Sequence, residues 1–118
     1  MEPCAPHAVL ARMGDKWTIM VVSLLSLAHE NRLRFSQLQR GVQGVSQRML
    51  TLTLRSLEKD GLVTRRVYAE VPPRVEYALT ELGLSLLPAL EGFTRWIKAN
   101  WQSIEASRLA YARREELS

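Results

Sequence analysis

The sequence of 118 residues is poor in cysteine and lacks long hydrophobic runs. Its single cysteine, Cys4, excludes a disulfide within the chain and is typical of proteins of a reducing cytoplasm. The longest apolar stretch lies between Lys16 and His29, and it is shorter than the roughly 18 residues that a membrane-spanning helix needs. No basic segment followed by an apolar one marks a secretory signal peptide at the N-terminus. These absences predict a cytoplasmic protein without a membrane partner.

Residues suited to catalysis or metal binding are equally scarce. The two histidines, His7 and His29, fall on different predicted elements, and neither has a carboxylate or a second ligand at a metal-binding spacing. The sequence also has no glycine-rich phosphate-binding loop. We therefore expect no enzyme activity, no catalytic residue, no metal site and no cofactor.

The composition supports a folded chain with one basic region. Hydrophobic residues make up 47% of the chain and charged residues 24%, which favours one domain over residues 1–118. The net charge is +4, and between Arg32 and Arg74 nine basic residues stand against three acidic ones. This concentration of positive charge favours a nucleic-acid partner, although a solvated basic surface would have the same composition.

The first part of the chain shows the pattern of short helices separated by turns. Asp15 is placed to cap a helix that is apolar nearly all round and therefore buried, and Asn31 ends it. The residues from Arg32 to Arg34 favour an extended conformation but are too few to stand alone as a strand. The helices expected before residue 46 cover residues 7–13, 16–28 and 35–40.

The clearest helix signal covers residues 47–60. Ser46 is a favourable N-cap residue, and Gly61 suits the left-handed position that follows a last helical turn. Leucines at helical spacing predict one buried stripe, formed by Leu50, Leu54 and Leu57. The face left to solvent carries Gln47, Arg48, Thr51, Leu52 and Arg55.

This solvent face carries groups that can read DNA. The major groove, about 12 Å wide, admits a helix, and there arginine can pair with guanine and glutamine with adenine. We therefore predict that Gln47 and Arg48 contact base edges, and that Thr51 contacts a thymine methyl group or a phosphate. Ser46 and Arg55 are predicted to contact phosphates. The alternative is an amphipathic surface helix whose polar groups are merely solvated.

Two strands are expected next, over residues 62–68 and 74–79. In the second, apolar and polar residues alternate with the period of two that is typical of a half-buried strand. Pro72 and Pro73 cannot lie in a paired central strand, so they mark a hairpin tip. Basic side chains beside this tip are predicted to contact the DNA backbone or a minor groove: Arg65, Arg66 and Arg74. The alternative is a hairpin whose charges protect its edges from pairing.

The C-terminal residues predict a long helix that is capped by Thr80 and continues to about Arg114, with either a kink or a break at Pro88. Its apolar stripe is longer than the core of a small domain should cover, and it comprises Leu86, Leu90, Phe93, Trp96, Ile97, Trp101 and Ile104. We expect residues 1–14 and 81–114 to form dimerisation helices, with packing onto residues 17–27 as the alternative. The order of elements predicts a mostly helical α+β fold, a winged helix-turn-helix with a long C-terminal dimerisation helix.

Several sequence blocks resemble the HxlR family of bacterial transcriptional regulators, which are related to the MarR-type winged helix. The similar blocks are C-x9-G-D-K-W from Cys4, R-F-x-x-L from Arg34, V-S-Q-R-M-L-T-x-T-L-R-x-L-E-x-D-G-L-V from Val45, and V-P-P-R-V-E-Y-x-L-T-x-x-G from Val71. The resemblance extends from about Cys4 to Trp96. It implies a cytoplasmic homodimer that binds double-stranded DNA at a pseudo-palindromic operator, often as a repressor.

The signal that would control such a regulator is left open by the sequence. Cys4 is the candidate redox sensor, since a thiolate near a helix start is stabilised and some members of the family sense oxidants or electrophiles with a cysteine here. An inert thiol is the alternative. A small apolar ligand at the dimer interface is a second possible effector, and a winged helix used only for protein contacts is a rival function.

Overall fold

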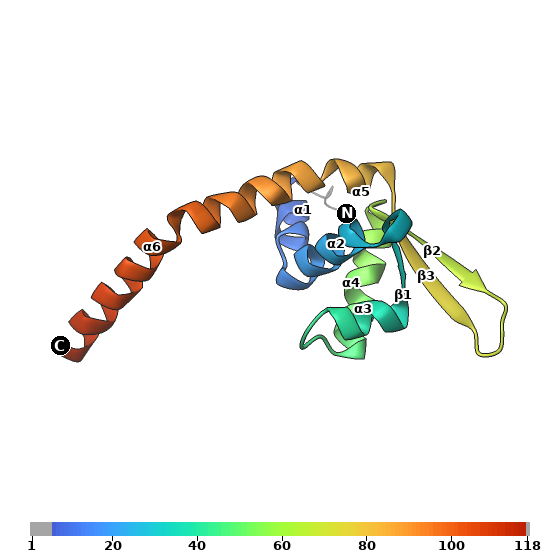
Figure 1. Cartoon of the computed structure of the whole chain (residues 1–118), viewed down its shortest axis with the longest axis horizontal. Helices are drawn as coiled ribbons and strands as arrows, with labels where there is room; N and C mark the ends of the chain where they lie inside the picture. The colour runs from blue at the N-terminus through green and yellow to red at the C-terminus, as the bar shows by residue number, and fades with distance from the viewer. Residues whose placement is uncertain (1–5, 118) are drawn as a thin grey trace. The chain divides into compact units, whose positions relative to one another are not determined.

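The computed structural model describes residues 6–117, with the side chains of residues 7–9 and 12 left out of the description. Cys4, the predicted redox sensor, lies outside the described residues. Along the chain the elements are α1 (Pro6–Met13), α2 (Lys16–Leu27), the short 3-10 helix η1 (His29–Asn31), β1 (Arg32–Arg34), α3 (Phe35–Gly41), α4 (Gln47–Lys59), β2 (Val63–Tyr68), β3 (Arg74–Leu79), α5 (Glu81–Ser85) and α6 (Leu87–Leu117) (Figure 1).

The buried helix expected after Asp15 is α2. Val21, Val22 and Leu25 are fully buried, and α2 packs against α4. Asp15 occupies the N-cap position with an extended backbone, but its side chain makes no capping hydrogen bond, so the cap is positional only. α2 ends at Leu27, one residue before the expected end, and Asn31 lies in η1. The side-chain amide of Asn31 donates to the carbonyl of Ser26 at 3.2 Å, which satisfies an end carbonyl that has no partner within the helix.

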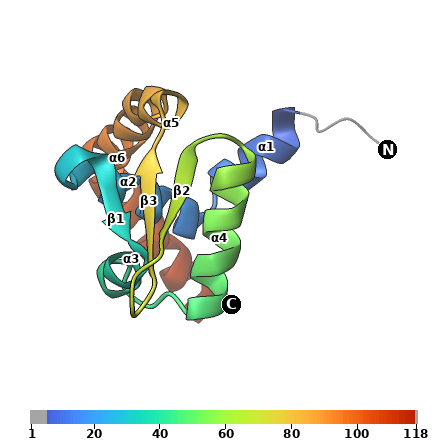
Figure 2. The ribbon, with the colours of Figure 1, turned by 90° about the vertical axis from the view of Figure 1, so that its right-hand side faces the viewer.

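Residues 32–34 are extended as expected, and they do not stand alone. They form β1, which pairs antiparallel with β3 in the register Arg32–Ala78, Leu33–Tyr77 and Arg34–Glu76. β2 pairs with the other edge of β3, so the sheet has the order β1-β3-β2 (Figure 2). A three-residue strand is too short alone, but here it adds its hydrogen bonds to a hairpin that already exists.

The sheet has one face toward the helices and one face away from them. Tyr77 and Leu79 of β3 are buried, and β2 contacts α4. The register places Arg65 directly opposite Tyr77, whereas its neighbour Arg66 lies opposite Glu76. Because successive side chains of a strand point to opposite faces, Arg65 belongs to the helix side and Arg66 to the outer side.

The helix-turn-helix consists of α3, the turn after it, and α4. Leu38 of α3 is fully buried, and Val42 and Val45 anchor the turn in the core. α4 ends at Lys59, and Gly61 follows with a φ of +79°, the left-handed conformation predicted for it. The mostly helical winged helix-turn-helix predicted from the order of elements is confirmed.

The C-terminal region contains a break at Pro88 rather than a kink. Thr80 caps α5, since its Oγ1 accepts a hydrogen bond from Gly83 N at 3.0 Å. The helix α5 ends at Ser85, and α6 starts with Pro88 in its first turn and reaches Leu117, three residues beyond the expected end. The chain divides into two compact units with the boundary between Leu87 and Pro88. Within residues 6–117 no helix combines the length and the hydrophobicity of a membrane span.

Candidate nucleic-acid interface

The helix α4 is fixed at its start and along one side. Ser46 Oγ accepts a hydrogen bond from Met49 N at 3.0 Å, which satisfies one of the free N–H groups of the first turn. The predicted stripe is buried, with exposed fractions of 0% for Leu50, 1% for Leu54 and 2% for Leu57. These contacts leave the position of the outer face little freedom.

The residues of α4 that are predicted to contact DNA lie on this outer face. Gln47, Arg48 and Arg55 are exposed and Thr51 is half-buried, and together with Leu52 they line one shallow, open hollow along α4. The hydroxyl of Thr51 donates to the carbonyl of Gln47 at 2.8 Å, so its proton is already used within the helix. Met49, which is 39% exposed, does not belong to this face and lines a separate hollow with Asp15 and Thr18.

Arg65 connects the wing, which is the hairpin of β2 and β3, to the helix α4. Its Nε lies 3.5 Å from Oε1 of Glu58, in the last full turn of α4. Tyr77, opposite Arg65 on β3, is buried, and this burial raises the pKa of its hydroxyl above the ordinary value, while Arg65, Glu58 and Arg55 act on it with charges of opposing sign. Tyr77 therefore stays neutral at physiological pH and contributes packing at this junction.

Arg74 is held by groups of the hairpin itself. Its Nη2 lies 3.2 Å from Oε1 of Glu70, and its guanidinium lies 4.0 Å from the centre of the Tyr68 ring. Its Nε is buried and finds no hydrogen-bond acceptor in the described part of the chain. Arg66 lies 5.1 Å from the same ring, and no carboxylate of the described residues pairs with it. The three wing arginines are thus placed in three different environments.

A polar network that the sequence prediction missed joins the three strands. Oε1 of Glu76 accepts a hydrogen bond from the Tyr68 hydroxyl and one from Arg32 Nη1, each at 3.3 Å. The side chain of Glu76 is only 15% exposed, which strengthens the pairing with Arg32. The period-two spacing of Arg66 and Tyr68, and of Arg74 and Glu76, could have indicated a shared face, but the partner strand β1 was not expected.

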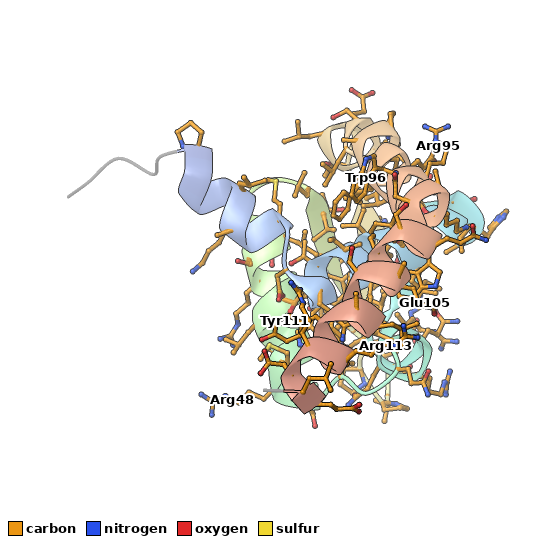
Figure 3. All side chains as sticks on the ribbon, turned by 90° about the vertical axis from the view of Figure 1, so that its left-hand side faces the viewer. Arg48, Arg95, Trp96, Glu105, Tyr111 and Arg113 are labelled. Carbon is orange, nitrogen blue, oxygen red and sulfur yellow. The ribbon has the colours of Figure 1, made fainter. Side chains whose placement is uncertain are left out.

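The apolar stripe of the C-terminal helix is exposed within the single chain. Phe93 and Trp96 are each 57% exposed, Trp101 49% and Ile97 36%, whereas Leu86, Leu90 and Ile104 are half-buried. Leu86 lies just before α6, at the C-cap of α5. Tyr111, seven residues after Ile104, continues the stripe by two turns and was not predicted. Figure 3 shows Trp96 and Tyr111 toward one side of α6, and Arg95 and Arg113 toward the other.

The fold and the geometry of α4 and its neighbouring hairpin together define the class of protein. A buried leucine stripe holds a polar helix at the surface next to a basic hairpin, which is the arrangement of a DNA-binding winged helix-turn-helix. The family model described as HxlR-like helix-turn-helix matches residues 12–105. The chain belongs to the HxlR family of transcriptional regulators.

Relatives of this chain carry the same description. It is 45% identical over 95 residues to an HTH-type transcriptional regulator of Methanothermobacter thermautotrophicus, covering 80% of this chain and 70% of the relative. It is 39% identical over 108 residues to the HTH-type transcriptional regulator YybR of Bacillus subtilis, covering 91% and 83%. The family and these relatives are transcriptional regulators and not enzymes, as the sequence predicted.

Solved structures show the same fold. The transcriptional regulator ytfH from Salmonella typhimurium has a TM-score of 0.77 and 35% identity, covering 86% of this chain and 88% of that one. The redox regulator HypR in its reduced form has a TM-score of 0.74 and 38% identity, covering 85% and 96%. In the described residues no three potential ligands among His, Cys, Asp and Glu lie close enough to share a metal ion.

Proposed function

We propose that this regulator is a cytoplasmic homodimer that represses transcription by binding a pseudo-palindromic operator through α4 and the wing. The observation that carries the proposal is the outer face of α4. It presents Gln47, Arg48, Thr51 and Arg55 together, while the leucines behind them are buried. A neutral face would be expected if the fold served only protein contacts.

Each residue of α4 has a role that its surroundings favour. Arg48 and Gln47 lie in the first turn, the part of a recognition helix that reaches base edges most directly. Thr51 has its proton engaged by the carbonyl of Gln47, so a contact of its methyl group with thymine fits better than donation to a phosphate. Ser46 accepts from Met49 and keeps its own proton for a phosphate oxygen.

We propose arginines for the remaining phosphate contacts. Arg55 stands two turns further along α4, on the same exposed face. In the wing, Arg66 and Arg74 supply positive charge to a backbone or a minor groove. Arg66 is the wing cation with no carboxylate partner among the described residues, so its charge is the most available to a phosphate.

Dimerisation through α6 would give the symmetry that an operator requires. A single helix in one groove reads few bases, whereas two copies read half-sites about one helical turn apart. The stripe of Leu90, Phe93, Ile97, Trp101 and Ile104, with Trp96 beside it and Leu86 before it, is the surface that we propose for the contact. A contiguous apolar surface of this length is unfavourable in water without a partner.

Redox control through Cys4 is the second element of the proposal. A solved relative with 38% identity is named a redox regulator, and its oxidised form has also been solved. Peroxide oxidises the Cys4 thiol to a sulfenic acid and is itself reduced to water. Because Cys4 is the only cysteine, this sulfenic acid can form a disulfide only with the partner's thiol or with a small thiol, and the condensation releases a second water. The rival effector is a small apolar ligand at the dimer interface.

Selection of bound DNA from a random library, with and without peroxide, tests the proposal. We expect enrichment of a site with two inverted half-sites, a dissociation constant that rises with salt, and release by peroxide that Cys4→Ala abolishes. A promoter that contains the site should then be less active in the presence of the protein. Binding that does not depend on salt, or the absence of any enriched sequence, would exclude this function.

A further inference from the structure

The junction between α4 and the wing contains an acidic residue in the most basic part of the chain. Glu58 is one of three acidic residues between Arg32 and Arg74, and it lies one turn after Arg55 on the helix proposed to bind DNA. A carboxylate near a DNA phosphate is repelled. Its presence at this place therefore needs a structural reason.

That reason is the contact with Arg65. Oε1 of Glu58 lies 3.5 Å from Nε of Arg65, and this ion pair joins the last full turn of α4 to the third residue pair of β2 and β3. The two elements are also joined by a short turn at Gly61 and pack against each other. The ion pair adds a polar contact beyond that turn, and it restrains the angle between helix and strand more than packing and turn alone would.

The register of the sheet separates Arg65 from Arg66. Arg65 is opposite the buried Tyr77, on the side of the sheet that faces the helices. Arg66 is opposite Glu76, on the outer side. The two adjacent arginines therefore lie on opposite faces of the sheet. Among the wing arginines, only Arg66 lacks a carboxylate partner in the described region.

We propose that Glu58 and Arg65 are a positioning pair that sets the wing at a fixed angle to α4, so that both reach their grooves on one operator half-site. In this assignment Arg65 acts through Glu58 and makes no phosphate contact, and Arg66 provides the phosphate contact of the wing. The inference rests on the proposed function, namely that α4 and the wing bind DNA. It also makes Glu58, an acidic residue, a residue that promotes DNA binding.

The test compares Glu58→Gln with Glu91→Gln, an exposed glutamate of α6 that gives the same change of charge. Dissociation constants are measured on the selected operator and on a random duplex. If charge alone mattered, both variants would bind both duplexes more tightly. We expect Glu58→Gln to weaken operator binding about fivefold with little loss on the random duplex. Equal, slightly tighter binding by both variants would overturn the inference.

Variants of the wing supply a second readout. Arg65→Gln should weaken operator binding by a similar factor while the dependence of log Kd on log salt keeps its slope, and Arg66→Gln should reduce that slope. The double variant Glu58→Gln, Arg65→Gln should lose no more than either single variant, because both remove the same pair. Additive losses, or equal reductions of the slope, contradict the assignment.

Two controls separate the possible failures. Arg65→Lys keeps the charge and can still reach Glu58, so it should retain operator affinity within about twofold even if Arg65→Gln is poorly folded. Unchanged thermal midpoints show that the losses are not unfolding. If the unaltered protein shows no operator preference, the proposed function fails. If it shows that preference and Glu58→Gln behaves like Glu91→Gln, only the positioning role fails.

Discussion

The guanidinium of Arg74 lies 4.0 Å from the centre of the Tyr68 ring on the neighbouring strand, and it pairs with Glu70 at 3.2 Å. Arg74 is therefore partly neutralised by its own hairpin. Arg66 lies 5.1 Å from the same ring and has no carboxylate partner among the described residues. The sequence predicts the same DNA contact for both arginines, but their surroundings in the structure differ.

This difference predicts unequal effects on the salt dependence of DNA binding. Arg66→Ala should reduce the slope of log Kd against log salt by about 1, since one phosphate loses its cation. Arg74→Ala should reduce the slope by less, because Glu70 already balances much of its charge. Titrations at several salt concentrations measure both slopes, and an equal reduction would show that the ion pair opens on DNA.

Arg48 is predicted to read a base. Arg48→Ala should weaken binding to the operator by about 1–3 kcal/mol and leave binding to random DNA nearly unchanged. The matched control is Arg113→Ala on α6, which removes the same charge from a helix that is not predicted to contact DNA. Competition assays with both duplexes give the two values, and equal losses on both would move Arg48 from base reading to phosphate contact.

Ser46 is predicted to contribute to stability through its cap. Ser46→Ala removes the acceptor for Met49 N and should lower the free energy of unfolding by about 1 kcal/mol. Ser46→Asn provides another good capping side chain, so it should keep most of the stability. Urea unfolding of the three proteins tests this, and the same loss for both variants would argue against the cap as the cause.

Gly83 and Gly92 are predicted to respond oppositely to alanine. A Cβ at Gly83 would overlap the carbonyl oxygen of Leu62, so Gly83→Ala should cost more than about 2 kcal/mol of stability. At Gly92, inside α6, a Cβ would meet no atom within 4 Å, so Gly92→Ala should gain about 0.5–1 kcal/mol of helix stability. Thermal unfolding compares the two, and a tolerated Gly83→Ala would contradict the close packing of α5.

Trp101 is predicted to contribute to the dimer contact. Trp101→Ala should raise the dimer dissociation constant at least about tenfold, because large aromatic residues dominate the energy of such interfaces. Leu109→Ala is the control: Leu109 is 56% exposed on α6 but lies off the stripe by the helical period. Sedimentation equilibrium measures both, and a protein that is monomeric at micromolar concentration would contradict the proposed interface.

The local pattern of the sequence determined the main helices, the hairpin and the helix-turn-helix. Ser46, the leucine stripe and Gly61 specify α4 within one residue of its observed end, because caps and helical periodicity are local properties. Strand β1 could not be predicted in this way. Three extended residues are too few to form a strand alone, and Arg32–Arg34 becomes a strand only because β3 offers a free edge.

The sequence by itself thus determined that this chain is a winged helix-turn-helix regulator and which face of α4 is exposed. It did not determine what each wing arginine does. That depends on which side chains the fold places beside each one: Glu58 for Arg65, Tyr68 and Glu70 for Arg74, and no carboxylate of the described residues for Arg66. Ion pairs and ring contacts form between side chains that only the folded chain brings together, so only the tertiary structure could decide these roles.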